Sequence, residues 1–509
     1  MNQEDLYWFT FILVTLLGFY TYKLLTRHRS YFRLLRVPFE RPHFMYGNLN
    51  DVLSGKLTTM EQLEQFYRKF SNHGQVTEFF GFFNYMTPAL YVRDPALIRQ
   101  LLQPNMNHFE SHGYFLDETK DSFLGSQLHL VKGDDKTTKL SSFISPIFHS
   151  PNVLSSMDAT VQKCCASLID FIASRVELEL ELKAIFLKHT LNMFAGIAFG
   201  KQLNTFQDDS DRFCTVSSGM AYGTNPVQVM KTMAFYLVPG LMRSVGVQFT
   251  DREEMDYLVK QYHTAASAPT YHSIARYLSQ ANEKMKSSQQ LTDAQLSAQC
   301  AMFFTKGFEP TLNLLSFAAY ELAQNPDVQR KLYEEMHHNG LTESATGVPP
   351  FESIKSLHYL EAIVLETLRK WPPHPLLVRE CTKPFIIPAT ENGDRASIPL
   401  KVGDKLYLSV WALHRSENYF PQPERFDPER FVGNEANATH PHTFIPFGIG
   451  RGCVGQEFVK LLVKATLVAL VQRYKLQPGE RTPEPLKLVE SASSLEARDG
   501  FWIRLEQRL

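Results

Sequence analysis

The chain has 509 residues, of which 44% are hydrophobic and 12% aromatic, a composition that supports a large buried core and excludes wholesale disorder. Its formal net charge of −1 gives no electrostatic basis for binding nucleic acid. The six cysteines show no C-x-x-C spacing and no paired framework, which favours reduced thiols in the cytosol, at most one or two of them with chemical roles.

The first residues predict a membrane anchor. An uncharged apolar run extends from Leu6 to Tyr22, close to the lower length limit for a helix that spans a bilayer. Acidic residues precede this run and basic residues follow it, so the positive-inside rule places the rest of the chain in the cytosol. A cleavable signal peptide would carry its positive charge before the run, where the sequence has none. We therefore expect a single-span anchor over residues 1–25.

Beyond a basic, proline-containing hinge over residues 26–45, the sequence predicts one large domain over residues 46–509. Most periodic segments from about 60 to 380 are helical, while strand patterns are short, such as those around Tyr91 and Ile386. No internal repeat interrupts them, so we expect a mainly α fold with a minor β component. The apolar segment Phe235 to Phe249, broken by Pro239 and Gly240, fits either a core element or a patch at the membrane interface.

A helical pattern from Thr305 to Pro326 carries a proline in its middle. Pro310 removes one helical hydrogen bond and clashes with the carbonyl of Lys306, four residues back. Strain at such a point is often functional, while a kinked core helix is the alternative. Glu309 and Thr311 flank the proline.

A second helical pattern contains the sequence ETLR. Its Glu366 and Arg369 are three residues apart and share a helix face, so the two side chains can form an ion pair. Apolar neighbours surround the pair, so we expect it to be partly buried. The alternative is an exposed pair, which would contribute little to stability. A half-buried pair needs a further partner, and Arg430 in the segment ENYFPQPERFDPERF could supply it.

The stretch FIPFGIGRGCVGQEF places a lone cysteine, Cys453, in a glycine-rich loop before an apolar helical pattern. The positive end of a helix and nearby backbone amides stabilise a thiolate, the form of cysteine that binds metals. Arg451 could neutralise an anionic cofactor group near the same loop. A buried structural cysteine before a helix remains the alternative when the loop is considered alone.

In their order along the chain, these features resemble a cytochrome P450, a haem-thiolate monooxygenase of the membrane-bound eukaryotic type. The shared order is an anchor, a basic stretch, a proline hinge, a long helix with G-x-E, then E-x-x-R, P-E-R-F and the cysteine loop. Phrases such as VPFERPHFMYGNL, YLEAIVLETLRKWPP and WALHRSENYFPQPERFDPERF are similar to insect enzymes of the detoxification clan. The similarity covers the chain from residue 37 onward and implies the cytochrome P450 fold.

The resemblance also implies roles for individual residues. Cys453 matches the cysteine whose thiolate is the axial ligand of the iron in haem b. Arg451 and Arg379 match residues that contact the haem propionates, and Phe447 matches the aromatic residue beside the thiolate.

Two further groups of residues match family positions. Glu366, Arg369 and Arg430 match the buried triad that braces the cysteine loop. Glu309 matches the acidic residue that helps to deliver protons, and we expect it to act with Thr311 or with water as the catalytic pair.

The cysteine loop and the region before it depart from the family pattern. The loop is one residue short between Gly450 and Arg451, relative to the usual F-x-x-G-x-R-x-C-x-G. The family's W-R-x-x-R is replaced by VKGDDKTTKL, in which Lys136 or Lys139 could substitute for a lost propionate contact. The simpler interpretation is that both lysines lie on the surface in contact with water. A lysine is a point charge and cannot bind a carboxylate through two parallel N–H groups, as an arginine does.

The helix expected across the haem departs most. Pro310 occupies the position of the threonine that usually relays protons, and Thr311 lies about 100° further round an ideal helix. Loss of that hydroxyl should favour leakage of peroxide. Lys306 replaces a small residue, and its amine could interfere with the iron or ligate it.

The resemblance therefore implies a monooxygenase on the endoplasmic reticulum membrane, with its catalytic domain in the cytosol. Its expected electron donor is NADPH–cytochrome P450 reductase, with cytochrome b5 as a second candidate, and its expected substrate is a lipophilic small molecule such as a xenobiotic or hormone. Two alternatives stay open: an isomerase or lyase that acts on peroxides, and an impaired protein that only binds haem or ligand. The substrate itself is not identifiable from the sequence.

Overall fold

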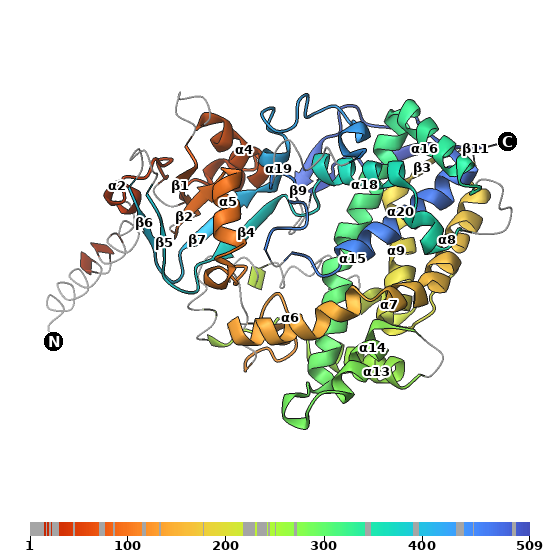
Figure 1. Ribbon diagram of the computed structural model, residues 1–509, viewed down its shortest axis with the longest axis horizontal. Helices are drawn as coiled ribbons and strands as arrows, with labels where there is room; N and C mark the ends of the chain where they lie inside the picture. The colour runs from red at the N-terminus through yellow and green to blue at the C-terminus, as the bar shows by residue number, and fades with distance from the viewer. Residues whose placement is uncertain are drawn as a thin grey trace, which may run out of the picture. The chain divides into compact units, whose positions relative to one another are not determined.

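The computed structural model describes most of the chain (Figure 1). The described residues are 15–16, 18–19, 22, 30–43, 46–70, 77–84, 87–113, 119–131, 134–176, 178–216, 230–231, 242, 245–249, 251–268, 272–341, 348–389, 396–433, 442–450, 452–490 and 495–508. Most of the expected anchor, most of the segment 235–249, and Arg451 lie outside these ranges. Within them, no helix has the length and apolar character needed to cross a membrane.

The chain forms two compact units, and the smaller one comprises Met1–Gly113 with Leu376–Ala412. Its main sheet has the strand order β1-β2-β7-β4, and a separate hairpin pairs β5 with β6. β1 and β2 are antiparallel, as are β7 and β4, while β2 and β7 are parallel. The strands are β1 (Phe79–Asn84), β2 (Thr87–Val92), β4 (Leu376–Glu380), β5 (Phe385–Ile387), β6 (Ile398–Leu400) and β7 (Lys405–Ser409).

The helices of this unit begin where the sequence supplies caps. A capping box of Thr58 and Glu61 starts α4, and Asp94 caps α5, whose first residue is Pro95. The helical elements are α2 (Tyr31–Leu34), α3 (Asn50–Leu53), α4 (Thr59–Lys69), α5 (Pro95–Leu102) and η1 (Met106–His108). The short helix α19 (Val410–His414) lies where the chain passes from this unit to the larger one.

The larger unit, Tyr114–Pro375 with Leu413–Leu509, is mainly helical. Its strands form a sheet of order β3-β11-β8 and a pair of β9 with β10: β3 (Glu179–Glu181), β8 (Tyr474–Pro478), β9 (Leu488–Glu490), β10 (Leu495–Ala497) and β11 (Trp502–Gln507). Its helical elements are α6 (Asp134–Phe148), α7 (Pro151–Ser156), α8 (Asp158–Ala173), α9 (Leu182–Phe199), α13 (Arg252–Ser267), α14 (Ile274–Glu283), α15 (Asp293–Gln324), α16 (Pro326–His338), α17 (Phe351–Lys355), α18 (His358–Lys370), α20 (Gln456–Arg473), η2 (Leu124–Ser126), η3 (Ser287–Gln289) and η4 (Pro428–Phe431).

Helix α15 is the central element of the larger unit (Figure 1). It contacts α9, α13, α14, α16, α18, α20 and β8, and side chains on all its faces are buried, as expected of a helix inside a large core. A capping box of Thr292 and Gln295 starts it. The helix continues through Pro310, so the long helix predicted there is confirmed and begins earlier than the apolar pattern indicated.

The expected fold class is confirmed. The strand patterns around Tyr91 and Ile386 are β2 and β5, and the helical patterns that contain Glu366 and that follow Cys453 are α18 and α20. All six cysteines are free, and Cys453 is the exposed one while the other five are buried. The predicted boundaries of the anchor, the hinge and the domain stay predictions.

Candidate active site

The loop before Cys453 is folded by hydrogen bonds within its own backbone. The Gly448 N–H donates to the Ile445 carbonyl at 3.0 Å, and the Cys453 N–H donates to the Phe447 carbonyl at 3.1 Å. Gly448 and Gly450 have φ values of +85° and +79°, a region that side chains disfavour. The glycines thus permit a tight loop that presents the cysteine side chain at its end.

Cys453 lies just before the N-terminus of α20, a helix of 18 residues that begins after Gly455. The positive end of the helix dipole therefore lies beside the sulfur. Burial raises the pKa of the Cys453 thiol, and a hydrogen bond from the Gly455 backbone opposes that effect. A bound metal cation deprotonates a coordinating thiol, so ligation of a metal would oppose this effect of burial.

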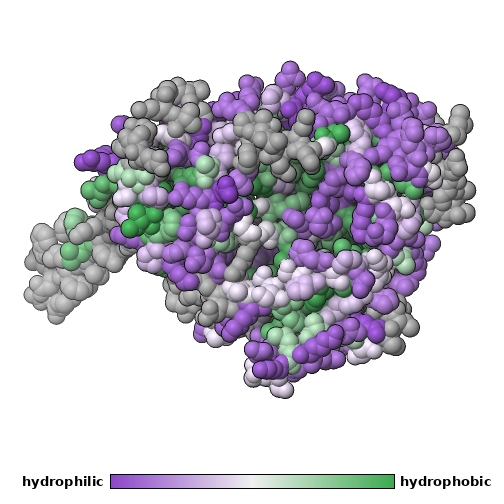
Figure 2. Space-filling view, in the orientation of Figure 1, coloured by the Kyte–Doolittle hydropathy of each residue, from purple (hydrophilic) through white to green (hydrophobic). Residues whose placement is uncertain are grey.

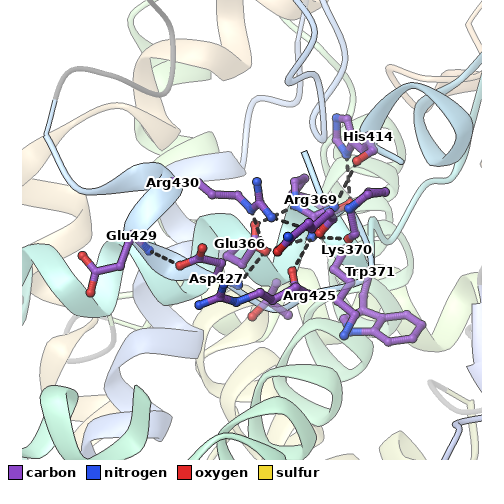
Figure 3. A network of polar contacts seen from close by, with 12 residues as sticks. Glu366, Arg369, Lys370, Trp371, His414, Arg425, Asp427, Glu429 and Arg430 are labelled. Atoms are coloured by element: carbon purple, nitrogen blue, oxygen red, sulfur yellow. Dashed lines mark hydrogen bonds and ion pairs between the residues drawn. The ribbon is translucent and has the colours of Figure 1, made fainter. Parts of the chain in front are cut away.

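Glu366 and Arg369 form a fully buried pair on α18 (Figure 3). Arg369 donates from Nε to Glu366 Oε2 at 2.6 Å and from Nη2 to Oε1 at 2.8 Å, a bidentate arrangement. The Asp427 N–H also donates to Oε1, at 2.9 Å, and Arg430 forms an ion pair with the same oxygen at 3.6 Å. Burial raises the pKa of Glu366, while the two guanidinium groups oppose this. The predicted contact of Arg430 with the pair is confirmed.

Arg369 connects this pair to the cysteine loop through His414, a residue that sequence reasoning missed. Arg369 Nη1 donates to the His414 carbonyl at 3.0 Å, and Nη2 donates to the Pro423 carbonyl at 2.8 Å. The His414 ring accepts the Ile445 N–H at Nε2, at 3.0 Å, so Nδ1 carries the proton and donates to the Arg369 carbonyl at 3.2 Å. Ile445 opens the loop that ends at Cys453, so His414 couples the buried pair to that loop.

We expect His414 to make the protein sensitive to acid. Burial lowers the pKa of His414 to about 3, whereas an unfolded histidine titrates near 6.5. As the pH falls, the unfolded state binds the proton before the folded state does. The contribution of the neutral His414 to the free energy of unfolding is therefore complete above pH 6.5 and is lost as the pH falls toward 3. The loss should be about 1 kcal/mol between pH 6.5 and 5.5. Urea unfolding at several pH values measures it.

The matched variant for this prediction is His414→Asn, which keeps a donor and an acceptor but does not titrate. The free energy of unfolding of this variant at neutral pH should be lower than that of the wild type. Between pH 6.5 and 5.5, however, it should decrease by about 1 kcal/mol less than in the wild type. His189, whose pKa burial also lowers to about 3, keeps its own contribution in both proteins. An unchanged pH dependence in the variant would show that His414 is not the responsible group.

One face of α15 carries an exposed side chain between two packed contacts. The Phe303 ring contacts Phe458, in the first turn of α20, with centroids 5.3 Å apart. Fourteen residues later on nearly the same helix face, Phe317 stacks on Trp371 with centroids 4.7 Å apart. Between these contacts the side chain of Lys306 is exposed, although the flanking helix turns are buried. A central helix that exposes a side chain between two packed contacts faces an internal hollow.

His374, three residues after Trp371, lines the same region. Its side chain is exposed although the neighbouring Pro373 and Pro375 are buried. Burial lowers the pKa of His374 to about 4, and burial also lowers the pKa of Lys306. A side chain that is exposed and yet desolvated by the surrounding protein lies in a recess of the molecule. Cys453 combines the same two properties, so the three side chains belong to the interior of the larger unit.

The other predicted site residues of the larger unit differ in exposure. Glu309 is buried, with 5% of its surface exposed. Thr311 is fully buried, and its hydroxyl donates to the Gly307 carbonyl at 2.6 Å, so it could reach a ligand only after that bond breaks. Phe447 is half-buried within the cysteine loop. Arg451 lies outside the described residues.

Arg379 belongs to the smaller unit, on β4 opposite Leu406 of β7. Its guanidinium is buried and donates to His112, but its Nε has no partner among the described residues. Burial lowers the pKa of Arg379 to about 10. A buried guanidinium with an unused N–H and no compensating carboxylate fits an anionic ligand group such as a haem propionate.

Lys136 and Lys139 are exposed on α6, as the surface interpretation expected. Together with Lys284 they line a groove of about 950 Å³ between α6, α14 and the start of α15. Figure 2 shows hydrophobic surface just below α6, bordered by hydrophilic residues. Neither Lys306 nor Cys453 lines this groove, so it is separate from the cavity described above.

An accessible cysteine just before α20, in a loop that His414 links to the buried pair of Glu366 and Arg369, is the arrangement expected of a haem-thiolate protein. The family profile for cytochrome P450 matches residues 37–500, and the chain belongs to that family. Members of the family hold haem through a cysteine thiolate, and the chain is a monooxygenase of the oxidoreductase class.

Curated relatives from insects match along nearly the whole chain. Probable cytochrome P450 9f2 of Drosophila melanogaster is 31% identical over 526 residues, which cover 98% of this chain and 99% of that protein. Cytochrome P450 9c1 of the same species is 31% identical over 523 residues, covering 98% of each. Cytochrome P450 9e2 of Blattella germanica is 26% identical over 544 residues, covering 100% of this chain and 99% of that protein.

Proposed function

We propose that this chain is a membrane-anchored monooxygenase of the endoplasmic reticulum that oxidises a lipophilic small molecule, in xenobiotic or hormone metabolism. Electrons come from NADPH through NADPH–cytochrome P450 reductase, with cytochrome b5 as a further donor. The single observation that carries the proposal is Cys453, an accessible thiol in the glycine-rich loop just before α20. The apolar run at Leu6–Tyr22 with its basic flank supports the anchor.

The residues present fit haem b. Cys453 would hold the iron, and the buried, incompletely paired guanidinium of Arg379 would pair with a propionate. The resemblance implies a second propionate contact for Arg451. The Phe447 carbonyl accepts the Cys453 N–H, which supports the role that the resemblance implies for Phe447 beside the sulfur. When bound, the haem supplies the reductive activation of molecular oxygen. The protein binds the substrate, excludes water and controls protons around it.

Proton control is where this chain departs from its family. Glu309 is an acidic group one helical turn from Lys306, and Thr311 carries a hydroxyl two residues further along α15. We assign the catalytic role to these two residues, with Glu309 holding the proton at its carboxyl group. The Thr311 hydroxyl donates to the Gly307 carbonyl, so it must turn away from that carbonyl before it can donate to a ligand.

We predict that restoring the family pattern improves coupling. In the double variant Pro310→Thr with Lys306→Ala, a hydroxyl returns to the relay position and the cation leaves the cavity. The amount of hydrogen peroxide released per NADPH consumed should fall about tenfold. This change is smaller than the full effect that a positioned proton donor has on a reaction rate. Peroxide, NADPH and product are measured together in the reconstituted system.

Pro146→Thr is the matched control, because Pro146 also lies inside a helix, α6, but is exposed and lines the groove between α6 and α14. That variant should leave the ratio of peroxide to NADPH unchanged. If the double variant also leaves both peroxide release and product unchanged, the role assigned to this turn of α15 is wrong.

The proposal is tested with purified full-length protein, reductase and lipid. Oxidation of a lipophilic substrate should require both NADPH and molecular oxygen. Turnover of a lipid hydroperoxide without NADPH would instead identify an isomerase or lyase. Such an enzyme does not activate molecular oxygen, so it does not need the threonine that Pro310 replaces. Absence of either activity from protein that holds haem would support a binding protein.

A further inference from the structure

The groove between α6, α14 and the start of α15 has walls that hydrogen bonds hold in place. Near the end of α14, Asn282 donates from Nδ2 to the Leu291 carbonyl at 3.0 Å and accepts the Leu291 N–H at Oδ1, at 2.8 Å. The side chain of Gln299, which lines the groove, donates to the Ser126 carbonyl at 2.7 Å and accepts the Leu128 N–H at 3.1 Å. Because these contacts fix its walls, the groove of about 950 Å³ is preformed, with a volume in the range of small-molecule sites.

One face of α6 changes from charged to apolar along the groove. The lining residues of this face are spaced three or four apart, so they form one row on the helix: Lys136, Lys139, Phe143 and Ile147. Lys139 is exposed, whereas Phe143 is half-buried and Ile147 is buried. The row extends about 16 Å along the helix axis, from two cations to two apolar side chains. It separates a charged end of the groove from an apolar one.

A third cation lies at the charged end of the groove. α14 packs against α6, and the Tyr277 hydroxyl donates to Ser156 Oγ, at the end of α7, at 2.8 Å. α14 thus starts beside the helix that follows α6, so α14 and α6 run in opposite directions (Figure 1). Lys284, directly after α14, also lines the groove, about 10 Å beyond Tyr277 toward the start of α6. It therefore lies at the end of the groove that carries Lys136 and Lys139.

The positive charge at this end has no balancing carboxylate among the described residues that line the groove. Lys139 and Lys284 also form no ion pair with a residue in the described part of the chain. Figure 2 shows that the surface just below α6 is hydrophobic, with hydrophilic residues around it. The groove therefore complements a molecule with a negatively charged head and an apolar chain, because opposite charges attract and apolar surface is favourably removed from water.

We propose that this groove binds one single-chain anionic amphiphile, a long-chain carboxylate, at a second site separate from Cys453. The carboxylate lies near Lys139 and Lys284, and the chain lies along Phe143 and Ile147. Because the lysines are exposed, the chain provides most of the affinity and the charge provides the selectivity. None of the described residues assigned to the catalytic or haem site lines the groove, so the inference does not depend on the proposed function.

Titration of the haem-loaded, full-length protein in lipid nanodiscs tests the inference, with empty nanodiscs as the blank. Dodecanoate and methyl dodecanoate have the same chain, but only dodecanoate carries a charge. Calorimetry at pH 7.5 and about 10 mM ionic strength should give dodecanoate an affinity about threefold to tenfold higher than that of the ester. This preference should weaken as salt is added, because salt screens exposed charges. Equal affinities at low ionic strength would overturn the inference.

Variants of the lysines assign the preference to the groove. The double variant Lys139→Met with Lys284→Met should lose the preference for dodecanoate while changing the affinity for the ester by less than about threefold. Lys286→Met is the control and should keep the full preference, because Lys286 is an exposed lysine before η3 that does not line the groove. A preference that survives the double variant contradicts the proposal, because it places dodecanoate elsewhere in the protein.

Variants of Phe143 test the apolar wall. Phe143→Ser should weaken the binding of both ligands by about tenfold, whereas Phe143→Leu should bind them nearly as the wild type does. Unchanged binding in Phe143→Ser would overturn the placement of the chain along α6. Sedimentation of the same proteins identifies a different occupant: a wild-type dimer that Phe143→Ser dissociates would assign the groove to a second copy of the chain, and the proposal would be wrong.

Failure of the proposed function is recognised separately. Each protein is first reduced and treated with carbon monoxide, and the red-shifted Soret band confirms thiolate ligation before any ligand is added. A wild type without that band contradicts the proposed function alone, because the groove contains none of the described haem-site residues. A normal band with equal binding of acid and ester contradicts only the site in the groove.

Discussion

Replacing Cys453 should abolish the spectroscopic signature of the protein while leaving its fold largely intact. Cys453→His offers a neutral nitrogen ligand in place of the thiolate, so haem can still bind, but the reduced carbon monoxide complex should lose its red-shifted Soret band completely. Monooxygenase turnover should fall at least about a thousandfold, because the electron-donating ligand is gone. The carbon monoxide difference spectrum measures the first effect and the reconstituted assay the second.

Cys214→Ser is the matched control for this variant. Cys214 is a free, buried thiol of the same unit, with 6% of its surface exposed, and no hydrogen bond joins it to the cysteine loop among the described residues. Its variant should keep the red-shifted band in full. Retention of that band by Cys453→His would mean that another cysteine ligates the iron, and Cys453 would then be a structural residue.

The shape of the cysteine loop could be predicted from the sequence because its determinants are local. Gly448 and Gly450 occupy positive φ values, and Gly455 precedes α20, so a glycine-rich stretch before an apolar helical pattern is sufficient to predict the loop. The pair of Glu366 and Arg369 was also predictable, since residues three apart share a helix face. Spacing along one element carries this kind of information.

His414 could not be recognised in the same way. Its two ring nitrogens join Arg369 on α18 to Ile445, which are far apart in sequence, and only the folded chain brings them together. A histidine beside an apolar helical run looks like any core histidine. The WALHRS phrase was noticed only as part of a resemblance, without a role for the ring.

The middle of α15 shows a different limit of sequence reasoning. Pro310 suggested a break or kink, but the helix runs on, because contacts from α9, α18 and α20 hold it on several sides. The same contacts explain why Thr311 is fully buried and bonded to the Gly307 carbonyl. Lys306 is exposed because no neighbouring element that the structure describes covers that face of α15. The packing of neighbouring elements cannot be predicted from the spacing of residues along one helix.

Breaking the buried pair of Glu366 and Arg369 should have the largest effect on folding. Glu366→Gln preserves shape but removes the carboxylate, so Arg369, with no exposed surface, keeps its charge without an anionic partner in bidentate contact. Removing one partner of a buried ion pair costs about 3–5 kcal/mol. Because Arg369 also donates to the His414 carbonyl, the disturbance should reach the cysteine loop and lower haem retention.

An exposed pair of the same residue types provides the control. Arg330 and Glu334 approach to 2.6 Å on α16, as close as Arg369 and Glu366, but their side chains are 58% and 50% exposed. Glu334→Gln should therefore leave the free energy of unfolding nearly unchanged, because water and salt screen an exposed pair. Urea unfolding and the haem absorbance per protein compare the two variants. Similar losses in both would mean that burial does not govern the strength of the Glu366–Arg369 pair, and the cysteine loop would need another brace.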